Sequence, residues 1–175
     1  MHGRRRSCAL LTVIIATALS GCALFASPVS VPDGNGMCAV PPEPLYFGTP
    51  VENLSSNPIT LTGARLGDSD GAALSGVLIF PQITEADGST LMLGVGRDLA
   101  SDSPDLWATR QPLDGFVVQP GQHVSVGFEV SRVPGSEIAT VASQIITYRV
   151  NGEFFDRQAT SRLRFAIAED CDAIE

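Results

Sequence analysis

The residues of this chain that could form a catalytic site are a serine flanked by glycines and a histidine that follows it. Residues 67–71 read Gly-Asp-Ser-Asp-Gly, which matches the Gly-x-Ser-x-Gly pattern of a nucleophile elbow. His123 follows Ser69 in the order of a catalytic triad, with four candidate acids between them: Asp98, Asp102, Asp105 and Asp114. An elbow requires a helix directly after the serine, and no helical pattern follows Ser69. We therefore expect residues 67–71 to form a hairpin turn and the protein to be no enzyme, with no catalytic residues.

The acidic and sulfur-containing side chains do not form a convincing metal-binding pattern. Asp68 and Asp70 have the wrong spacing for a calcium loop, because Leu66 and Val77 occupy the positions of its first and last ligands. His123 is the only histidine after the first 22 residues, which leaves too few ligands for a copper site. We expect no metal and no cofactor.

The N-terminal residues have the organisation of an export signal. Arg4–Arg6 precede an apolar run over residues 9–18, which is shorter than the roughly 20 residues of a membrane-spanning helix. The run ends in Leu19-Ser20-Gly21-Cys22, which resembles the lipobox of bacterial lipoproteins. That resemblance implies cleavage after residue 21, attachment of a diacylglycerol with acyl chains such as palmitate to the Cys22 thiol, and anchoring on the extracytoplasmic face of the cell membrane. An ordinary secretory signal peptide cut at another position is the alternative.

The charge balance limits the choice of partners. The chain has 175 residues, with 11 Arg, no Lys and 19 Asp and Glu. Removal of residues 1–21 would leave 8 Arg against those 19 acids, a formal charge of −11. Such a surface disfavours nucleic acid and anionic headgroups, so we expect membrane contact through acyl chains and an envelope protein of unknown identity as partner. The use of Arg without Lys is typical of GC-rich genomes, and we expect an actinobacterial origin.

Two cysteines remain once the signal peptide and the acylated residue are set aside. Cys8 lies in residues 1–21, which leaves Cys38 and Cys171 near opposite ends of the folded part. An oxidising compartment and an even number of thiols predict one disulfide between them. Closing so long a loop stabilises a fold by about 4 to 5 kcal/mol in the chain-entropy view. The alternative, a two-thiolate metal site, lacks further Cys or His ligands at short spacing.

Residues 22–44 are rich in proline and glycine and show no periodicity. That composition excludes a helix and a central strand, so we interpret residues 22–44 as a tether between the lipid and the folded domain, residues 45–175. Between Cys22 and Cys38 a flexible chain has a typical reach of about 20 Å, which would keep the domain near the membrane.

From residue 45 onward, short β-like runs alternate with turn signals. Residues 124–130 alternate apolar and polar side chains, which predicts a strand with His123, Ser125, Gly127 and Glu129 facing water. The Asn151-Gly152 pair predicts a hairpin turn after a strand at residues 145–150, with residues 153–155 returning. Further strands are expected over residues 45–53, 59–66, 76–80, 90–95, 113–118 and 162–168.

About seven short strands without an internal repeat favour an all-β, antiparallel sandwich of two sheets. Residues 51–61 and 118–126 each place a turn before a strand, the latter through Pro-Gly before a Val-rich run. They resemble corresponding stretches of bacterial immunoglobulin-like domains, which implies an immunoglobulin-like sandwich over residues 45–168. The inter-sheet cysteine pair with a core tryptophan that antibody domains have is absent. A small closed barrel of strands is the alternative.

The longest stretch without strand alternation, residues 96–112, is the candidate recognition surface. At most, Ser103-Pro104 starts one helical turn there, with Ser103 as its cap. The loop combines acidic with apolar residues: Asp98, Asp102, Asp105, Leu106 and Trp107. That combination suits a basic partner with a hydrophobic pocket. Alternatively the three acids are merely solvated or hold a cation, and Trp107 closes one end of the sandwich.

These observations favour a cell-envelope lipoprotein that acts as a non-enzymatic protein-interaction or structural module. Two alternatives come from other functional classes. One is a solute- or metal-binding accessory of an envelope transport or assembly system. The other is a small serine hydrolase that uses Ser69 and His123.

Overall fold

The computed structural model describes residues 27–172, and the predicted signal peptide and Cys22 lie outside them. The elements in chain order are β1 (Val29–Ser30), β2 (Asp33–Ala39), β3 (Leu45–Asn53), β4 (Ile59–Leu66), β5 (Ser69–Asp70), β6 (Ala72–Pro81), β7 (Ile83–Thr84), β8 (Thr90–Leu91), β9 (Val95–Gly96), α1 (Leu99–Asp102), α2 (Pro104–Ala108), β10 (Gln111–Pro112), β11 (Val117–Val118), β12 (His123–Arg132), β13 (Ala139–Val141), β14 (Gln144–Val150) and β15 (Arg157–Ile167).

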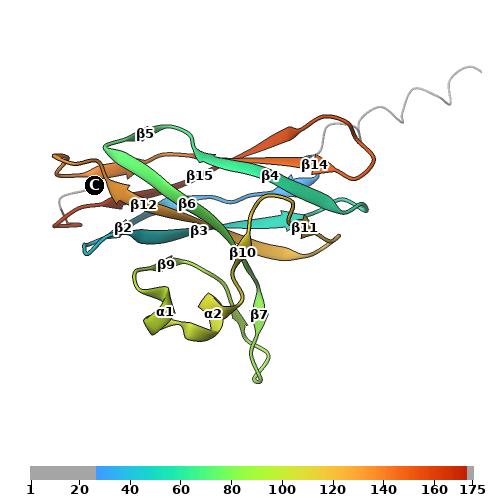
Figure 1. Ribbon diagram of the computed structural model, residues 1–175, viewed down its shortest axis with the longest axis horizontal. Coiled ribbons are helices and arrows are strands. Elements are labelled where there is room, and N and C mark those ends of the chain that lie inside the picture. The colour runs from blue at the N-terminus through green and yellow to red at the C-terminus, as the bar shows by residue number, and fades with distance from the viewer. Residues whose placement is uncertain (1–26, 173–175) are drawn as a thin grey trace, which may run out of the picture.

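The strands form two facing sheets, seen as two layers in Figure 1. The first sheet has the order β1-β3-β12-β6-β10, and β9 also pairs with β3. The second has the order β11-β4-β14-β15-β13-β5, with β2 on the other side of β15. The neighbours β1, β3, β12 and β6 correspond to strands A, B, E and D of an immunoglobulin domain, and β4, β14 and β15 correspond to C, F and G. The predicted antiparallel, immunoglobulin-like sandwich is confirmed.

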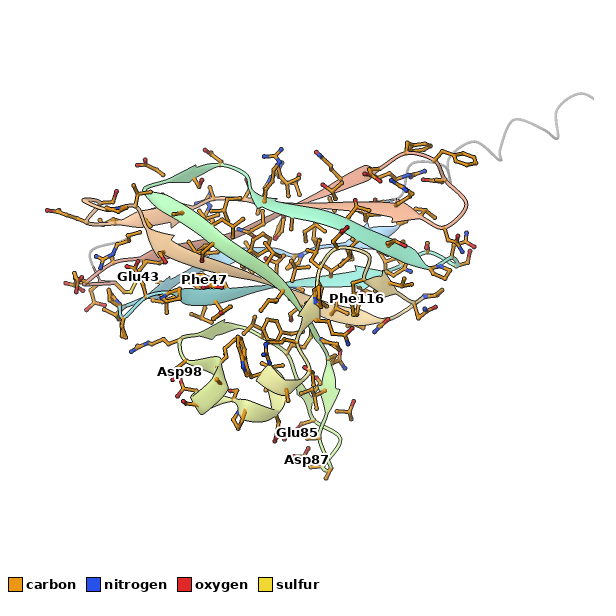
Figure 2. The ribbon with its side chains drawn as sticks, in the orientation of Figure 1. Glu43, Phe47, Glu85, Asp87, Asp98 and Phe116 are labelled. Atoms are coloured by element: carbon orange, nitrogen blue, oxygen red, sulfur yellow. A yellow bond between two sulfur atoms is a disulfide. The ribbon has the colours of Figure 1, made fainter. Side chains whose placement is uncertain are left out.

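The core lies between the two sheets because alternate residues of the long strands point inward. In β3, the inward-facing residues Leu45, Phe47 and Val51 are buried, and an even number of positions separates them, as expected for one face of a strand. Phe47 stacks on Phe165 of β15, with ring centroids 3.9 Å apart and planes 8° from parallel. Figure 2 shows Phe47 within the sandwich. This contact joins the first sheet to the second.

The predicted tether over residues 22–44 is wrong for much of the part that the structure describes. β1 pairs with the end of β3, and β2 pairs in parallel with β15, with Cys38 opposite Ala166. The prolines of residues 22–44 lie outside β1 and β2, and the glycines of β2 are tolerated because β2 is an edge strand, where one side of the backbone needs no partner. The folded domain therefore begins before residue 45.

The segment between β6 and β12 folds against the sandwich instead of forming a loop. We call residues 82–112 the insert; they contain the β7–β8 hairpin, β9, α1, α2 and β10. Figure 1 shows β7, β9, α1 and α2 of the insert below the first sheet, on its outer face, whereas β10 lies beside β6 as the edge strand of that sheet. The prediction that Ser125 and Gly127 face water is therefore wrong, because the insert buries both, whereas His123 is exposed as expected.

Most of the remaining strand predictions are confirmed, several with changed lengths, and one is wrong. β3 and β4 have the predicted bounds, whereas residues 90–95 divide between β8 and β9 and residues 113–118 contribute only β11. Residues 153–155 are not a strand, because the loop after β14 extends to residue 156 before β15 begins. Within residues 27–172, none of the helices has the length and apolar character required to span a membrane.

Candidate interaction surface

A second, smaller apolar cluster holds the insert on the first sheet. Phe80 of β6 is buried with three insert residues, Leu93, Leu99 and Leu106. The sheet approaches the insert closely at two glycines. The Gly48 amide donates to the Gly94 carbonyl at 2.7 Å, and a Cβ on Gly48 would lie 1.9 Å from the Leu93 carbonyl oxygen. A Cβ on Gly127 would lie 2.8 Å from Leu93 Cδ2 of the insert. Glycine at these outward-facing positions therefore makes the docking possible.

A groove of about 320 Å³ remains between the insert and the start of β3. Its lining includes two prolines, two aromatic rings and an arginine: Pro42, Pro44, Tyr46, Arg97 and Trp107. The exposed Ala100 of α1 lies on its rim. We call this cavity the insert groove.

Two aromatic residues form one wall of the insert groove. Tyr46 and Trp107 meet edge to face with ring centroids 5.7 Å apart, and Phe80 lies 6.4 Å from Trp107 on the buried side. The Arg110 guanidinium lies 4.1 Å from the Trp107 ring centroid and donates to the Trp107 carbonyl at 2.8 Å. Both Tyr46 and Trp107 are only partly buried. The wall therefore presents a fixed aromatic surface to solvent.

The electrostatics of the groove keep the Tyr46 phenol neutral. Desolvation by burial raises the pKa of Tyr46, and the charge of Glu129 and a hydrogen bond to it raise the pKa further. Glu129 is the cross-strand neighbour of Tyr46 on β12. The Arg110 charge acts in the opposite direction and lowers the pKa of Tyr46. A protonated phenol can donate a hydrogen bond to Glu129.

The structure separates the residues of the predicted recognition loop into different roles. Asp98 caps α1 by accepting from the Ser101 amide, and Figure 2 shows Asp98 at the insert. Asp102 and Asp105 are exposed. Leu106 is 3% exposed because α2 turns it toward the sheet, so the prediction that Leu106 belongs to the recognition surface is wrong. The predicted helical turn at Ser103 is confirmed as α2, although the Ser103 side chain does not cap it.

Trp107 does not close an end of the sandwich; it packs on the outer face of the first sheet. The sequence interpretation also missed Tyr46 and Arg97 as groove residues. The sequence did contain one signal. Tyr46 and Gly48 of β3 lie on the same outer face of the sheet as Ser125 and Gly127 of β12. Small residues beside an outward-facing aromatic residue indicate that another segment packs there.

Ser69 and His123 lie at opposite ends of the sandwich. Ser69 belongs to β5, a two-residue strand and not a loop, and pairs with Val141, whereas His123 pairs with Glu52. β5 is followed by β6, so the strand–turn–helix context of a nucleophile elbow is absent at this position. Among residues 27–172, no three His, Cys, Asp or Glu side chains gather in a geometry that could hold a metal ion.

Cys38 and Cys171 form a disulfide with their Cα atoms 5.7 Å apart, which confirms that prediction. The alternative of a two-thiolate metal site is therefore wrong. The bridge spans 133 residues and ties the edge strand β2 to the segment after β15.

Another cavity, about 790 Å³, opens beside the β12–β13 loop, and the arginine in its lining already has partners. The Arg132 guanidinium pairs with Glu43 and with Glu169, and donates to the Glu137 carbonyl. Hydrogen bonds to Glu43 and then Glu169 raise the pKa of Arg132. These contacts join three segments of the chain and leave Arg132 little capacity for a ligand.

Comparison with known proteins identifies no family. No family model matches the chain, and no curated protein matches it. One similar structure is the VesB protease of Vibrio cholerae, with 12% identity over 81% of this chain and a TM-score of 0.40. This chain spans 32% of that protease chain. Another is the ASH / PapD-like domain 7 of human CEP192, with 7% identity, 95% and 98% coverage of the two chains and a TM-score of 0.39.

Proposed function

We propose that this chain is a bacterial envelope lipoprotein, anchored through Cys22 on the extracytoplasmic face of the cell membrane. Its immunoglobulin-like sandwich acts as a non-enzymatic protein-interaction module. The insert groove is its recognition surface. The β-sandwich itself is a scaffold on which many functions occur, so the proposal depends on the groove and not on the fold.

The observation that carries the proposal is the partly exposed Tyr46–Trp107 wall beside the apolar cluster that holds the insert on the sheet. The insert buries Leu93, Leu99 and Leu106 but leaves both rings accessible from the groove. Rigid aromatic side chains in a concave surface are typical of the centres of protein interfaces. The groove volume of about 320 Å³ accommodates one or two side chains of a partner, and not a large ligand.

The negative charges on the insert indicate that the partner carries basic residues around its apolar contact. Asp98, Asp102 and Asp105 are exposed along α1 and the start of α2. A partner with an apolar side chain for the groove and basic residues for these carboxylates fits the surface. Because the carboxylates are solvent-exposed, they would act mainly on the association rate and lose influence as salt increases.

Cell fractionation tests the lipid anchor. We expect Cys22→Ala to move the full-length protein out of the membrane fraction and to remove the mass of the acyl groups. Unchanged membrane association and unchanged mass in Cys22→Ala would reject the anchor.

Crosslinking in cells tests the recognition surface. The tagged lipoprotein is treated with a chemical crosslinker before purification, and wild type is compared with Trp107→Ala and with Ile138→Ala. Ile138 is a suitable control because it is 45% exposed and lies in the β12–β13 loop, away from the insert. We expect Trp107→Ala to lose the discrete crosslinked species that Ile138→Ala keeps, with both variants folded. Persistence of those species in Trp107→Ala would reject the groove as the recognition surface.

A further inference from the structure

One end of the sandwich exposes large apolar side chains that the proposed function does not use. The β14–β15 loop, residues 151–156, contains Phe154, which is 100% exposed, and Phe155, which is 58% exposed. In the adjacent β3–β4 turn, Leu54 is 59% exposed. The two connections touch, because the Asn151 amide donates to the Pro58 carbonyl at 2.9 Å. We call this end, with its two connections, the phenylalanine end.

The described chain begins at the same end. Val29 pairs with Asn53, and the Leu54 amide donates to the Pro28 carbonyl at 2.8 Å. Five residue steps separate Ser27 from Cys22. Even a fully extended chain of that length spans at most about 18 Å. An acyl group on Cys22 would therefore keep the phenylalanine end close to the bilayer surface.

The charges at this end are balanced, although the protein as a whole is strongly acidic. Asp156 pairs with Arg149 at 2.8 Å, and Glu153 pairs with Arg157. The Arg157 guanidinium also lies 5.3 Å from the centre of the Phe155 ring. Each carboxylate of the β14–β15 loop thus has an arginine partner, which reduces its repulsion from a lipid surface.

We infer that Phe154 and Phe155 insert into the interfacial region of the bilayer that holds the acyl chains of Cys22. This inference rests on the proposed lipid anchor and extends it, because it makes the β14–β15 loop a second membrane contact. Exposed phenylalanine side chains are buried favourably at the boundary between the headgroups and the acyl chains of a bilayer. The phenylalanine end thus contacts a lipid surface.

The test uses full-length lipoprotein reconstituted into phosphatidylcholine vesicles that contain brominated lipid, which quenches tryptophan by contact. The background is Trp107→Phe, which removes the only native tryptophan. Phe154→Trp places the reporter in the loop, and Ile138→Trp places a matched exposed reporter in the β12–β13 loop at the other end of the sandwich. Unfolding curves verify that both variants fold.

We expect the tryptophan at position 154 to shift to the blue and to lose most of its emission, whereas the tryptophan at 138 keeps its emission. Equal quenching of the two positions, or none at either, in protein that co-sediments with the vesicles would overturn the inference and leave the lipid anchor intact. Protection of position 154 from both brominated lipid and aqueous quencher would also overturn it, because a protein surface would then cover the loop. Protein that lacks acyl mass and fails to co-sediment would instead reject the proposed anchor.

Discussion

Tyr46 of β3 and Trp107 of α2 meet edge to face, with ring centroids 5.7 Å apart, although 61 positions separate them in the chain. Their contact joins the first sheet to the insert and forms the wall of the insert groove. Because each ring restricts the other, the wall is ordered before any partner arrives. Pre-ordered aromatic surfaces lose little conformational entropy on binding, which suits a recognition site.

Docking of the insert depends on the absence of a side chain at Gly48. We expect Gly48→Ala to lower the free energy of unfolding by about 1 to 3 kcal/mol, because its Cβ would meet the Leu93 carbonyl, which belongs to the backbone. Chemical denaturation followed by Trp107 emission measures both stability and displacement of the insert. Gly94→Ala is the matched control, since no heavy atom lies within 4 Å of its Cβ position. Equal stability of the two variants would contradict the docking account.

Two buried threonine hydroxyls should respond differently when the residue is replaced by valine, because only Thr49 belongs to a polar bridge between the sheets. The Thr49 hydroxyl donates to Gln144 Oε1 at 3.1 Å, and Gln144 Nε2 donates to the Leu163 carbonyl at 2.7 Å. Thr49→Val removes the hydroxyl and should cost about 1 to 3 kcal/mol of unfolding free energy. Among the described residues, the buried Thr62 hydroxyl has no partner, so Thr62→Val should leave stability unchanged or raise it. Denaturant unfolding of both variants measures the difference, and a larger loss in Thr62→Val would contradict this assignment.

The disulfide should account for a large share of the stability. We expect Cys38→Ser/Cys171→Ser to lower the free energy of unfolding by about 2 to 5 kcal/mol, because the bridge closes a long loop in the unfolded chain. Wild type unfolded in the presence of reductant should show the same loss. Peptide mapping under non-reducing conditions should recover one crosslinked pair. Two thiols that alkylate in the native protein would contradict the bridge.

The raised pKa of Tyr46 predicts an effect of alkaline pH on stability. An unfolded tyrosine titrates near pH 10, whereas the folded protein holds the proton on Tyr46 to higher pH. The contribution is therefore complete below about pH 10 and is lost as pH rises through the raised pKa. We expect Tyr46→Phe to lose less stability than wild type between about pH 9 and pH 11 in denaturant titrations. An equal loss in the two proteins would show that Tyr46 does not titrate as described.

Local patterns predicted the strands whose contacts are simple. β3 and β4 have the expected bounds because turn residues at 53–58 separate two runs that each place one face in the core. The disulfide was predictable from the even number of cysteines together with the expectation that the chain is exported. These features depend on local composition or on counting, so they do not require knowledge of the tertiary structure.

The parts that sequence patterns missed depend on distant contacts. β2 is a strand because β15, more than 120 residues later, offers a free edge for parallel pairing, which no local pattern reveals. Residues 96–112 of the insert looked irregular because their buried apolar residues, Leu99 and Leu106, match no helical or strand period. They become buried because Gly48 and Gly127 have no side chains, which allows the insert to pack on the outer face of the first sheet. The Tyr46–Trp107 wall follows from that docking.

Site-specific photo-crosslinking in living cells tests most directly whether the insert groove is the recognition surface. A photoreactive phenylalanine analogue replaces Ala100 on the groove rim, or Thr160, which is exposed on β15 of the other sheet. We predict that position 100 forms a discrete adduct with one envelope protein, that Trp107→Ala removes this adduct, and that position 160 forms none. An adduct of equal yield from position 160, or one from position 100 that persists in folded Trp107→Ala, would contradict the account.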